Sequence, residues 1–415
     1  MKKRVVCMSL ILLMIAGSFT CHAENVNGCE TKGVETSYDE TKWMTEEGYD
    51  YPVDAEDEKW EEFCSHDEMV AACNMPKGDL QKVSTEELVN LILDYPLLGD
   101  LMLYDDVLTG FEIMSKESNI LKEILSRKDG AEELLNAYCT LEISKESALP
   151  DDVLEYECTN EDYIRELVKD DEYSAMIEED YNNVIQDVLL ETALAQDEII
   201  DELSEKEISI LNEEVADKVE CKLDSELYSA YTFTFYEVAD EEGTIEQFED
   251  IEIVSDDSAS TTVKGNDTYA YVRTPRGSKV EVVKRTFNAA ETKAAYNYTV
   301  NRYPKAIICA DATTNYNCHS YAWYNQATTN KYWMNNPGKY MTDGSYKKVG
   351  AKPTATNQKV CYIQYQFDNP YIHSGIVKKI SGNIITIHSK WGAGPLVRHP
   401  VGYSPYGGTP TYYKR

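Results

Sequence analysis

The sequence predicts an α+β protein, in which an acidic, all-helical N-terminal region precedes a basic C-terminal domain of helices and strands. The first observation is a reversal of charge: residues 262–415 hold 21 Lys and Arg against 6 Asp and Glu, whereas residues 1–261 hold 18 against 68. The second is a change of period, because apolar residues recur at helical spacing before this reversal and alternate as in strands after it. A 415-residue chain with these two halves is expected to form bodies with different tasks.

Composition excludes several classes of function. The formal net charge of −35 argues against a general binder of nucleic acid or of anionic membranes, because phosphate binding requires positive charge. The hydrophobic share of 42% is enough to form packed cores, which excludes global disorder.

The first residues have the pattern of a secretory signal. A basic start, Met1–Arg4, precedes the apolar run Val5–Gly17, and a small residue, Ala23, ends the segment. We therefore expect a secreted protein that lies outside the cell or at the cell wall, with residues 1–23 removed. The alternative is a lipid anchor on Cys21. No later run of 18 apolar residues occurs in the sequence, so no transmembrane segment is expected.

The rest of the chain divides by its local pattern. A capping box at Ser84–Glu87 precedes Leu88, Leu91 and Ile92 at helical spacing, and further helical patterns follow, the longest over 180–220. Strand-like alternation begins near residue 230, and a turn at Pro275–Gly277 indicates a hairpin. The predicted parts are an irregular acidic segment (24–80), an acidic helical domain (81–236), a linker (237–268), a β-hairpin with its connection (269–300) and a C-terminal catalytic domain (301–415).

Cys318 is the first candidate for chemistry. It follows the polar turn Asn315–Asn317 and opens an aromatic-rich run that is typical of a helix. The N-terminus of a helix lowers the pKa of a thiol and its free N–H groups can stabilise an oxyanion. We therefore expect a reactive Cys318 with a depressed pKa.

Two histidines frame a second motif. His373 opens a predicted strand, Gly382 and Asn383 form the turn, and His388 closes the return strand. Because the ends of a hairpin are neighbours, we expect His388 to orient His373. A Cys–His pair with a third, orienting polar group is the arrangement of thiol acyl-transfer catalysis.

The runs Asn317–Trp323 and His373–Val377, with the Gly-Asn turn and the polar residue that closes the next strand, resemble the papain-like cell-wall hydrolases of the NlpC and CHAP kind. The resemblance covers roughly residues 300–415. It implies a papain-like fold in which the helix that bears the cysteine packs on a small antiparallel sheet. It also implies that Cys318 is the nucleophile, His373 the base and His388 the orienting residue, with Ser389 as the other candidate for that third role.

The same resemblance implies a function. It indicates a cysteine peptidase or amidase that cleaves peptidoglycan peptides through a thioester on Cys318, with no cofactor and no metal. Two alternatives remain open at this point. One is a thiol transpeptidase or transglutaminase-like acyltransferase, which would use the same residues, and the other is a non-catalytic wall-binding module.

Other roles for these residues are also open. Without Cys7 and Cys21 the chain keeps nine cysteines, an odd number, so Cys318 is either a free thiol, a buried structural thiol or a partner of Cys309 or Cys361. A zinc site from Cys318, His373, His388 and His399 is a further alternative, although no ligand spacing supports it. We expect His319 to pack or hydrogen-bond and His399 to be structural.

The charge reversal also predicts a contact within the chain. The acidic region is expected to dock on the basic domain and limit its access to the wall, with an attraction that salt screens over about 8 Å at physiological ionic strength. The alternative is that the acidic surface only provides solubility.

Overall fold

The structure is a computed structural model. It describes residues 43–45, 48–105, 107–142, 171–224, 236–239, 244–247, 268–285, 288–364 and 369–415. All the described residues belong to one compact unit. The predicted signal segment and the alternative lipid anchor lie outside the described residues, as does most of the strand expected near residue 230.

Helices and strands are both extensive, which confirms the α+β class. The predicted helix after Ser84 is confirmed as α3, and its capping box forms: Ser84 Oγ accepts from the Glu87 N–H, and the Glu87 carboxylate accepts from the Ser84 N–H. The helices of the N-terminal half, with two short 3-10 helices, are η2 (Trp60–Glu62), α1 (His66–Ala72), α2 (Lys77–Leu80), α3 (Thr85–Leu93), η3 (Leu98–Leu103), α4 (Val107–Glu117), α5 (Asn119–Ser126), α6 (Gly130–Thr140), α9 (Asp171–Leu194), α10 (Asp197–Ile200) and α11 (Glu205–Asp224).

The long helical pattern over 180–220 divides into three helices, α9, α10 and α11. Ser204 causes the last break, because its side chain accepts a hydrogen bond from the Glu207 N–H and its own N–H donates to the Glu207 carboxylate. This is the reciprocal arrangement that begins a new helix.

A seven-stranded antiparallel sheet forms the C-terminal half, in the order β7-β12-β11-β10-β9-β13-β8. Both predicted hairpins are confirmed, β5 with β6 and β10 with β11. The strands are β1 (Met44–Thr45), β2 (Gly48–Tyr49), β3 (Tyr236–Ala239), β4 (Thr244–Gln247), β5 (Thr268–Arg273), β6 (Lys279–Lys284), β7 (Ile307–Ala310), β8 (Lys347–Gly350), β9 (Lys359–Ile363), β10 (Tyr371–Ser381), β11 (Ile384–Lys390), β12 (Leu396–Pro400) and β13 (Pro410–Lys414). Among the described residues, β3 begins at the last residue of the predicted helical domain and pairs with β4, inside the segment predicted as a linker.

The two faces of this sheet belong to different cores. Successive residues of a strand point to opposite faces, and along β9 Val360 and Tyr362 enter one core while Cys361 enters the other. The second core also contains apolar residues of the β5–β6 hairpin, of η4 (Ser320–Tyr324) and of α14 (Gly338–Thr342). The first core is shared with the helical half.

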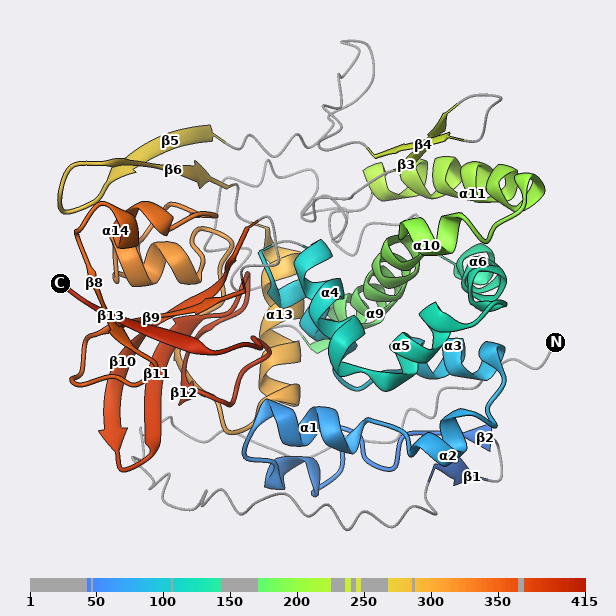
Figure 1. Cartoon of the computed structure of the whole chain (residues 1–415), viewed down its shortest axis with the longest axis horizontal. Coiled ribbons are helices and arrows are strands. Elements are labelled where there is room, and N and C mark those ends of the chain that lie inside the picture. The colour runs from blue at the N-terminus through green and yellow to red at the C-terminus, as the bar shows by residue number, and fades with distance from the viewer. Residues whose placement is uncertain are drawn as a thin grey trace. The chain divides into compact units, whose positions relative to one another are not determined.

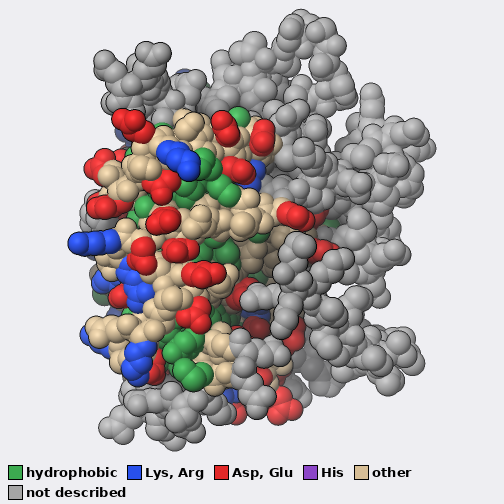
Figure 2. All heavy atoms as spheres, turned by 90° about the vertical axis from the view of Figure 1, so that its right-hand side faces the viewer, with side chains coloured by type: hydrophobic (Ala, Val, Ile, Leu, Met, Phe, Trp, Pro, Cys, Tyr) green, Lys and Arg blue, Asp and Glu red, His purple; other side chains and the backbone are tan. Residues whose placement is uncertain are grey.

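The helical half therefore covers one face of the sheet. The helix α13 (Ala289–Arg302) packs against α9 and η3 (Figure 1). Hydrogen bonds add to the apolar contact: Trp60 Nε1 donates to Arg302 O at 2.8 Å, and Lys305 Nζ donates to Phe63 O at 2.7 Å. Buried Tyr303 donates its hydroxyl to the Asp100 carboxylate. The outer face of the helical half carries many Asp and Glu side chains (Figure 2).

Within the described part of the chain, no helix is both long enough and apolar enough to cross a membrane.

Candidate active site

Cys318 lies in the first turn of a short helix, as expected. Asn317 caps this helix, because its backbone oxygen accepts from the Tyr321 N–H at 3.0 Å and its side-chain oxygen accepts from the Ser320 N–H at 3.1 Å. The helix continues as a π-helical turn, η4, which ends at Tyr324. Short π-helical segments are frequent at functional sites.

The environment of the Cys318 thiol differs from the expectation of a depressed pKa. The residue is 2% exposed, and burial raises the pKa of the thiol well above its usual value, with a further contribution from the Asp105 carboxylate. Hydrogen bonding from the backbone of Ser374 and His319 offsets part of this shift. Desolvation therefore outweighs the helix terminus, and the thiol is protonated at neutral pH.

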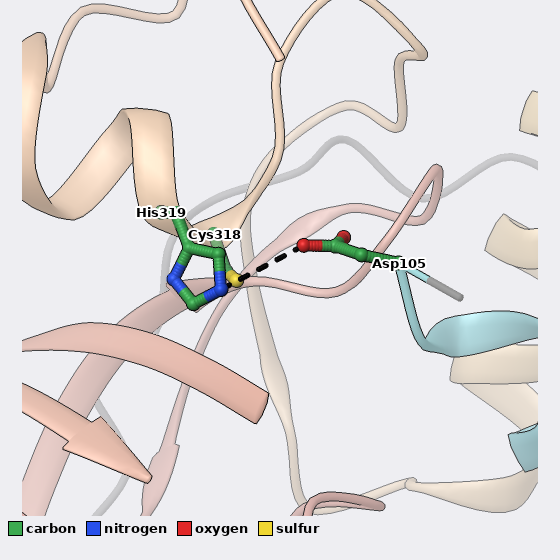
Figure 3. A group of neighbouring side chains, drawn as sticks. All are labelled: Asp105, Cys318 and His319. Carbon is green, nitrogen blue, oxygen red and sulfur yellow. Dashed lines mark ion pairs between the residues drawn. The ribbon is translucent and has the colours of Figure 1, made fainter. Parts of the chain in front are cut away.

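Asp105 comes from the helical half, just after η3, and reaches the helix that bears Cys318 (Figure 3). Its Oδ2 accepts a hydrogen bond from Asn317 Nδ2 at 2.8 Å and lies 3.8 Å from His319 Nε2. Nearby, Leu103 O accepts from the Tyr406 hydroxyl at 2.8 Å, and the Tyr104 and Tyr406 rings meet edge to face at 5.3 Å. Asp105 thus lies beside Cys318 on its helical side, and the two residues before it contact Tyr406.

His319 hydrogen-bonds in the core, as the sequence predicts. Its Nε2 lies 3.0 Å from Tyr371 O, and its Nδ1 lies 2.8 Å from Ser374 Oγ. Because a carbonyl oxygen only accepts, the ring proton is on Nε2, and Nδ1 accepts from the Ser374 hydroxyl. Trp323 Nε1 donates to the same hydroxyl at 2.8 Å, which ties the helix to β10. Burial lowers the pKa of His319 to about 4, so the ring is neutral.

Asp105, Cys318 and His319 bring three potential ligand atoms within 4.8 Å of one another. Both nitrogens of His319 already have partners, so this trio fits a hydrogen-bonded cluster better than a metal site. The zinc site considered from Cys318, His373, His388 and His399 is not assembled, because the side chains of His373 and His388 lie on opposite faces of the sheet.

His373 is fully buried on β10. It pairs with Tyr362 of β9, and its ring lies parallel to the Tyr406 ring with the centroids 3.6 Å apart. Neither ring nitrogen has a hydrogen-bond partner among the described residues. Burial lowers the pKa of this imidazole well below its usual value, and the neighbouring His399 lowers it further. His373 is thus a neutral imidazole next to Ser374, whose backbone contacts Cys318. Its ring points to the face opposite to that of the Ser374 side chain, and no hydrogen bond joins the thiol and the ring.

His388 does not reach His373. It pairs with Ile376, three residues along β10 from His373, so its side chain lies on the other face of the sheet. There its Nε2 lies 3.8 Å from Cys309 Sγ, and burial lowers its pKa to about 4. This position does not support the expected orienting role.

Ser389, the other candidate, lies on the face of His373. A Cβ atom on Gly375 would lie 3.3 Å from the Ser389 Cβ, so these two residues are opposite each other. Ser389 Oγ lies 2.7 Å from His399 Nε2 and accepts from Trp391 Nε1 at 3.0 Å. His399 Nδ1 lies 2.8 Å from Pro400 O, which places the ring proton there and leaves Nε2 to accept from Ser389. The structural role expected for His399 agrees with this network.

Sequence reasoning missed Lys390. Its ammonium group is fully buried and donates to Thr313 O at 2.9 Å and to Gly392 O at 2.7 Å. Burial lowers its pKa to about 7, although Glu291, Cys318 and Asp105 act in the opposite direction. No local signal marks Lys390, because a lysine that closes a strand is usually solvated.

The cysteine pattern leaves the candidate thiol free. Cys309, Cys318 and Cys361 form no disulfide, which excludes both pairings considered for Cys318, whereas Cys64 is disulfide-bonded. Disulfides are typical of exported proteins.

Comparison with known protein families, with curated proteins and with solved structures finds no match for this chain.

Proposed function

We propose that this chain is a secreted, thiol-dependent amidase or endopeptidase of papain-like fold, which acts on peptidoglycan peptides and is held in a latent form by its own helical half. The observation that carries the proposal is the position of Cys318. It begins a helix that packs on an antiparallel sheet, and its thiol meets the backbone of Ser374, the residue after His373. The backbone of Ser374 thereby joins the thiol and the helix N-terminus to the strand that carries His373, although the side chains of Ser374 and His373 point to opposite faces of that strand.

The proposed chemistry uses these groups in turn. His373 takes the proton of the Cys318 thiol, and the thiolate attacks the carbonyl carbon of the peptide bond. The N–H groups at the start of the helix stabilise the oxyanion. The leaving amine takes the proton from His373, and water then cleaves the thioester, which returns the thiol and releases the acid.

Ser389 is the better candidate for the third residue. It shares a face with His373, whereas His388 lies on the other face. Ser389 belongs to a buried network with His399 and Trp391 that fixes the wall beside the His373 ring. In this proposal Ser389 positions the base through that wall and does not touch the substrate.

Latency is supported by the segment Leu103–Asp105. The Asp105 carboxylate accepts a hydrogen bond from the cap residue Asn317. The Leu103 backbone oxygen accepts one from the hydroxyl of Tyr406, whose ring stacks on His373. Substrate therefore reaches Cys318 only after this segment moves. Such movement would also release Tyr406 and free the imidazole to approach the thiol.

The location and substrate rest on the sequence. The signal-like segment before residue 24 favours export, and the basic C-terminal half suits a polyanionic wall. The likeness to NlpC and CHAP hydrolases indicates peptidoglycan peptides as the substrate.

A second candidate is a non-catalytic module on the same fold. The observation that favours it is the buried Cys318 thiol with its raised pKa, which makes no hydrogen bond to His373. Displacement of Leu103–Asp105 distinguishes the two candidates, because only the hydrolase gains activity when the thiol is uncovered.

The experiment uses the full mature chain with a specific protease site placed between β4 and β5, so that the chain folds before it is cut. Because the halves share an apolar core, the cut protein is diluted so that the helical half, now without its covalent link, dissociates. Purified cell wall is digested with the cut and the uncut protein, each as wild type and as Cys318→Ala. Released peptides from the cut wild type alone would support the latent hydrolase. Labelling of Cys318 without any released or amine-coupled product would favour the non-catalytic module.

A further inference from the structure

A groove of about 390 Å³ opens between the β5–β6 hairpin and the segment that leads into α14. This volume lies within the range of about 300–1,000 Å³ that ligand sites occupy. Val280 and Val282 lie along the groove but are buried in the second core, and the side chains that can meet a ligand are Tyr271, Lys279, Glu281, Asn336, Lys339 and Tyr371.

The groove connects with the candidate active site through Tyr371. This residue lines the groove and opens β10, two positions before His373. Its backbone oxygen accepts the hydrogen bond from His319, the neighbour of Cys318. A chain-like ligand in the groove therefore lies beside the helix that bears the thiol.

An aromatic ring and two cations stand at the groove. Tyr271 is 61% exposed, and Lys279 Nζ lies 5.2 Å from the centroid of its ring. Neither Lys279 nor Lys339 forms an ion pair within the described part of the chain. Asn336 accepts from the Gly338 N–H through its side-chain oxygen, so its NH₂ group is oriented as a donor.

The charge of this region is opposite to that of the chain as a whole. Residues 268–285 carry five basic side chains and one acidic one, whereas the whole chain has a net charge of −35. A cationic rim on an acidic protein attracts an anionic ligand, and an exposed tyrosine offers an apolar face with a polar edge.

We propose that this groove binds a carboxylate-bearing oligosaccharide, with a sugar ring stacked on Tyr271, the carboxylate between Lys279 and Lys339, and hydroxyl or acetamido groups at Asn336 and Glu281. The assignment of this ligand as the glycan strand of the cell wall rests on the proposed function. In that setting the groove holds the glycan while the attached peptide enters the Cys318 site.

The test is calorimetric binding of a peptide-free oligosaccharide that contains N-acetylmuramic acid, with the full mature chain as Cys318→Ala so that no turnover occurs. Tyr271→Ala is expected to weaken binding about tenfold, the size of effect that loss of a central aromatic contact produces. Tyr271→Phe, which keeps the ring, is expected to bind within about twofold of the parent. The pair Lys279→Gln and Lys339→Gln is expected to weaken binding and to reduce its dependence on salt.

Matched controls come from the same hairpin. Tyr269 is 70% exposed and Lys284 is exposed, but neither lines the groove, so Tyr269→Ala and Lys284→Gln are expected to leave affinity unchanged. Equal losses from these controls would overturn the groove as the site. Equal binding of an uncharged chitooligosaccharide of the same length would overturn the carboxylate, and tighter binding of polyphosphate or of a single-stranded oligonucleotide would overturn the saccharide.

The binding test of the groove can succeed or fail independently of the digestion test of the proposed function. Specific binding without any wall digestion by the cut wild-type protein would support the groove and contradict the hydrolase. Digestion that depends on Cys318 without binding to this oligosaccharide would support the hydrolase and overturn the groove.

Discussion

A carboxylate oxygen of Asp105 lies within 4.8 Å of the Cys318 thiol, although 212 positions separate Asp105 from the cap residue Asn317 that it also binds. This contact joins the helical half to the helix that bears the candidate nucleophile. A negative charge beside a buried thiol adds to desolvation in keeping the proton on sulfur. The described arrangement is therefore that of a covered, protonated thiol.

The first prediction concerns the reactivity of this thiol in the uncut chain. With iodoacetamide at neutral pH, the exposed Cys309 should be alkylated before the buried Cys318. The rate at Cys318 should increase as the pH rises, because its raised pKa leaves little thiolate at neutral pH. Mass spectrometry of the digested protein measures both rates. Asp105→Asn should accelerate alkylation of Cys318, and alkylation of Cys318 as fast as Cys309 at neutral pH would contradict the covered state.

The second prediction concerns the bond that holds the covering segment. Tyr406→Phe removes the hydroxyl that donates to Leu103 O but keeps the ring on His373. Since a hydrogen bond contributes about 0.5–1.5 kcal/mol, alkylation of Cys318 should become roughly 2- to 12-fold faster.

Tyr362→Phe is the matched control for this variant. It removes a buried tyrosine hydroxyl that also donates to a backbone oxygen, that of Val401, but both residues belong to the C-terminal half. The same acceleration in Tyr406→Phe and Tyr362→Phe would mean that general destabilisation, and not release of Leu103, exposes the thiol.

The third prediction concerns salt. Sequence analysis expects an electrostatic attraction between the halves, yet their contact is a shared apolar core with hydrogen bonds such as that from Trp60 to Arg302 O. Hydrophobic contact is not screened by ions. Protection of Cys318 from alkylation should therefore persist at 1 M sodium chloride, where the Debye length is about 3 Å. A large loss of protection between low and high salt would restore the electrostatic interpretation.

The contrast between His388 and Ser389 shows where sequence reasoning reaches its limit. The sequence predicts the turn at Gly382 and Asn383, and from it an unbroken register would pair His388 with Val377, on the face of His373. The structure has a β-bulge at Lys378, because Val377 pairs with Ile387 while Lys379 pairs with Thr386. One extra residue exchanges the faces of everything beyond it, which turns His388 away and brings Ser389 to His373.

Local sequence patterns predict the other elements well, but they do not predict contacts between residues that are far apart in the chain. The capping box of α3, the helix start at Cys318 and both hairpins depend on residues within a few positions of one another. The contacts of Asp105 and Leu103 join segments that only the packed core brings together. The sequence predicts the pKa of Cys318 in the wrong direction for this reason, since its burial depends on those contacts.

The fourth prediction tests the third residue of the proposed enzyme. In the cut protein, Ser389→Ala should lower kcat on wall peptides by about tenfold, equivalent to about 1.4 kcal/mol, with little change in KM, because the residue positions a base and does not bind substrate. His388→Ala should leave kcat close to that of the parent. Thermal unfolding of both variants controls for loss of fold, and a reduced kcat in His388→Ala alone would return the role to His388.

The last prediction uses the buried ammonium of Lys390 to link stability to pH. Its pKa is about 7 in the folded protein because of burial, while an unfolded lysine has a pKa of about 10.4. Between these values the unfolded chain binds a proton that the folded chain does not, so this residue makes the free energy of unfolding rise with pH. Below pH 7 both states bind the proton and the contribution is constant.

Lys390→Met should therefore flatten the rise in stability between pH 7.5 and 9.5, measured by urea unfolding. The exposed Lys379→Met, on the neighbouring strand, should keep the slope of the parent. The hydrogen bonds that Lys390 donates to Thr313 O and Gly392 O are lost in the variant at every pH, so they lower stability without changing that slope. An unchanged slope in Lys390→Met would mean that Lys390 keeps its proton in the folded protein throughout this range.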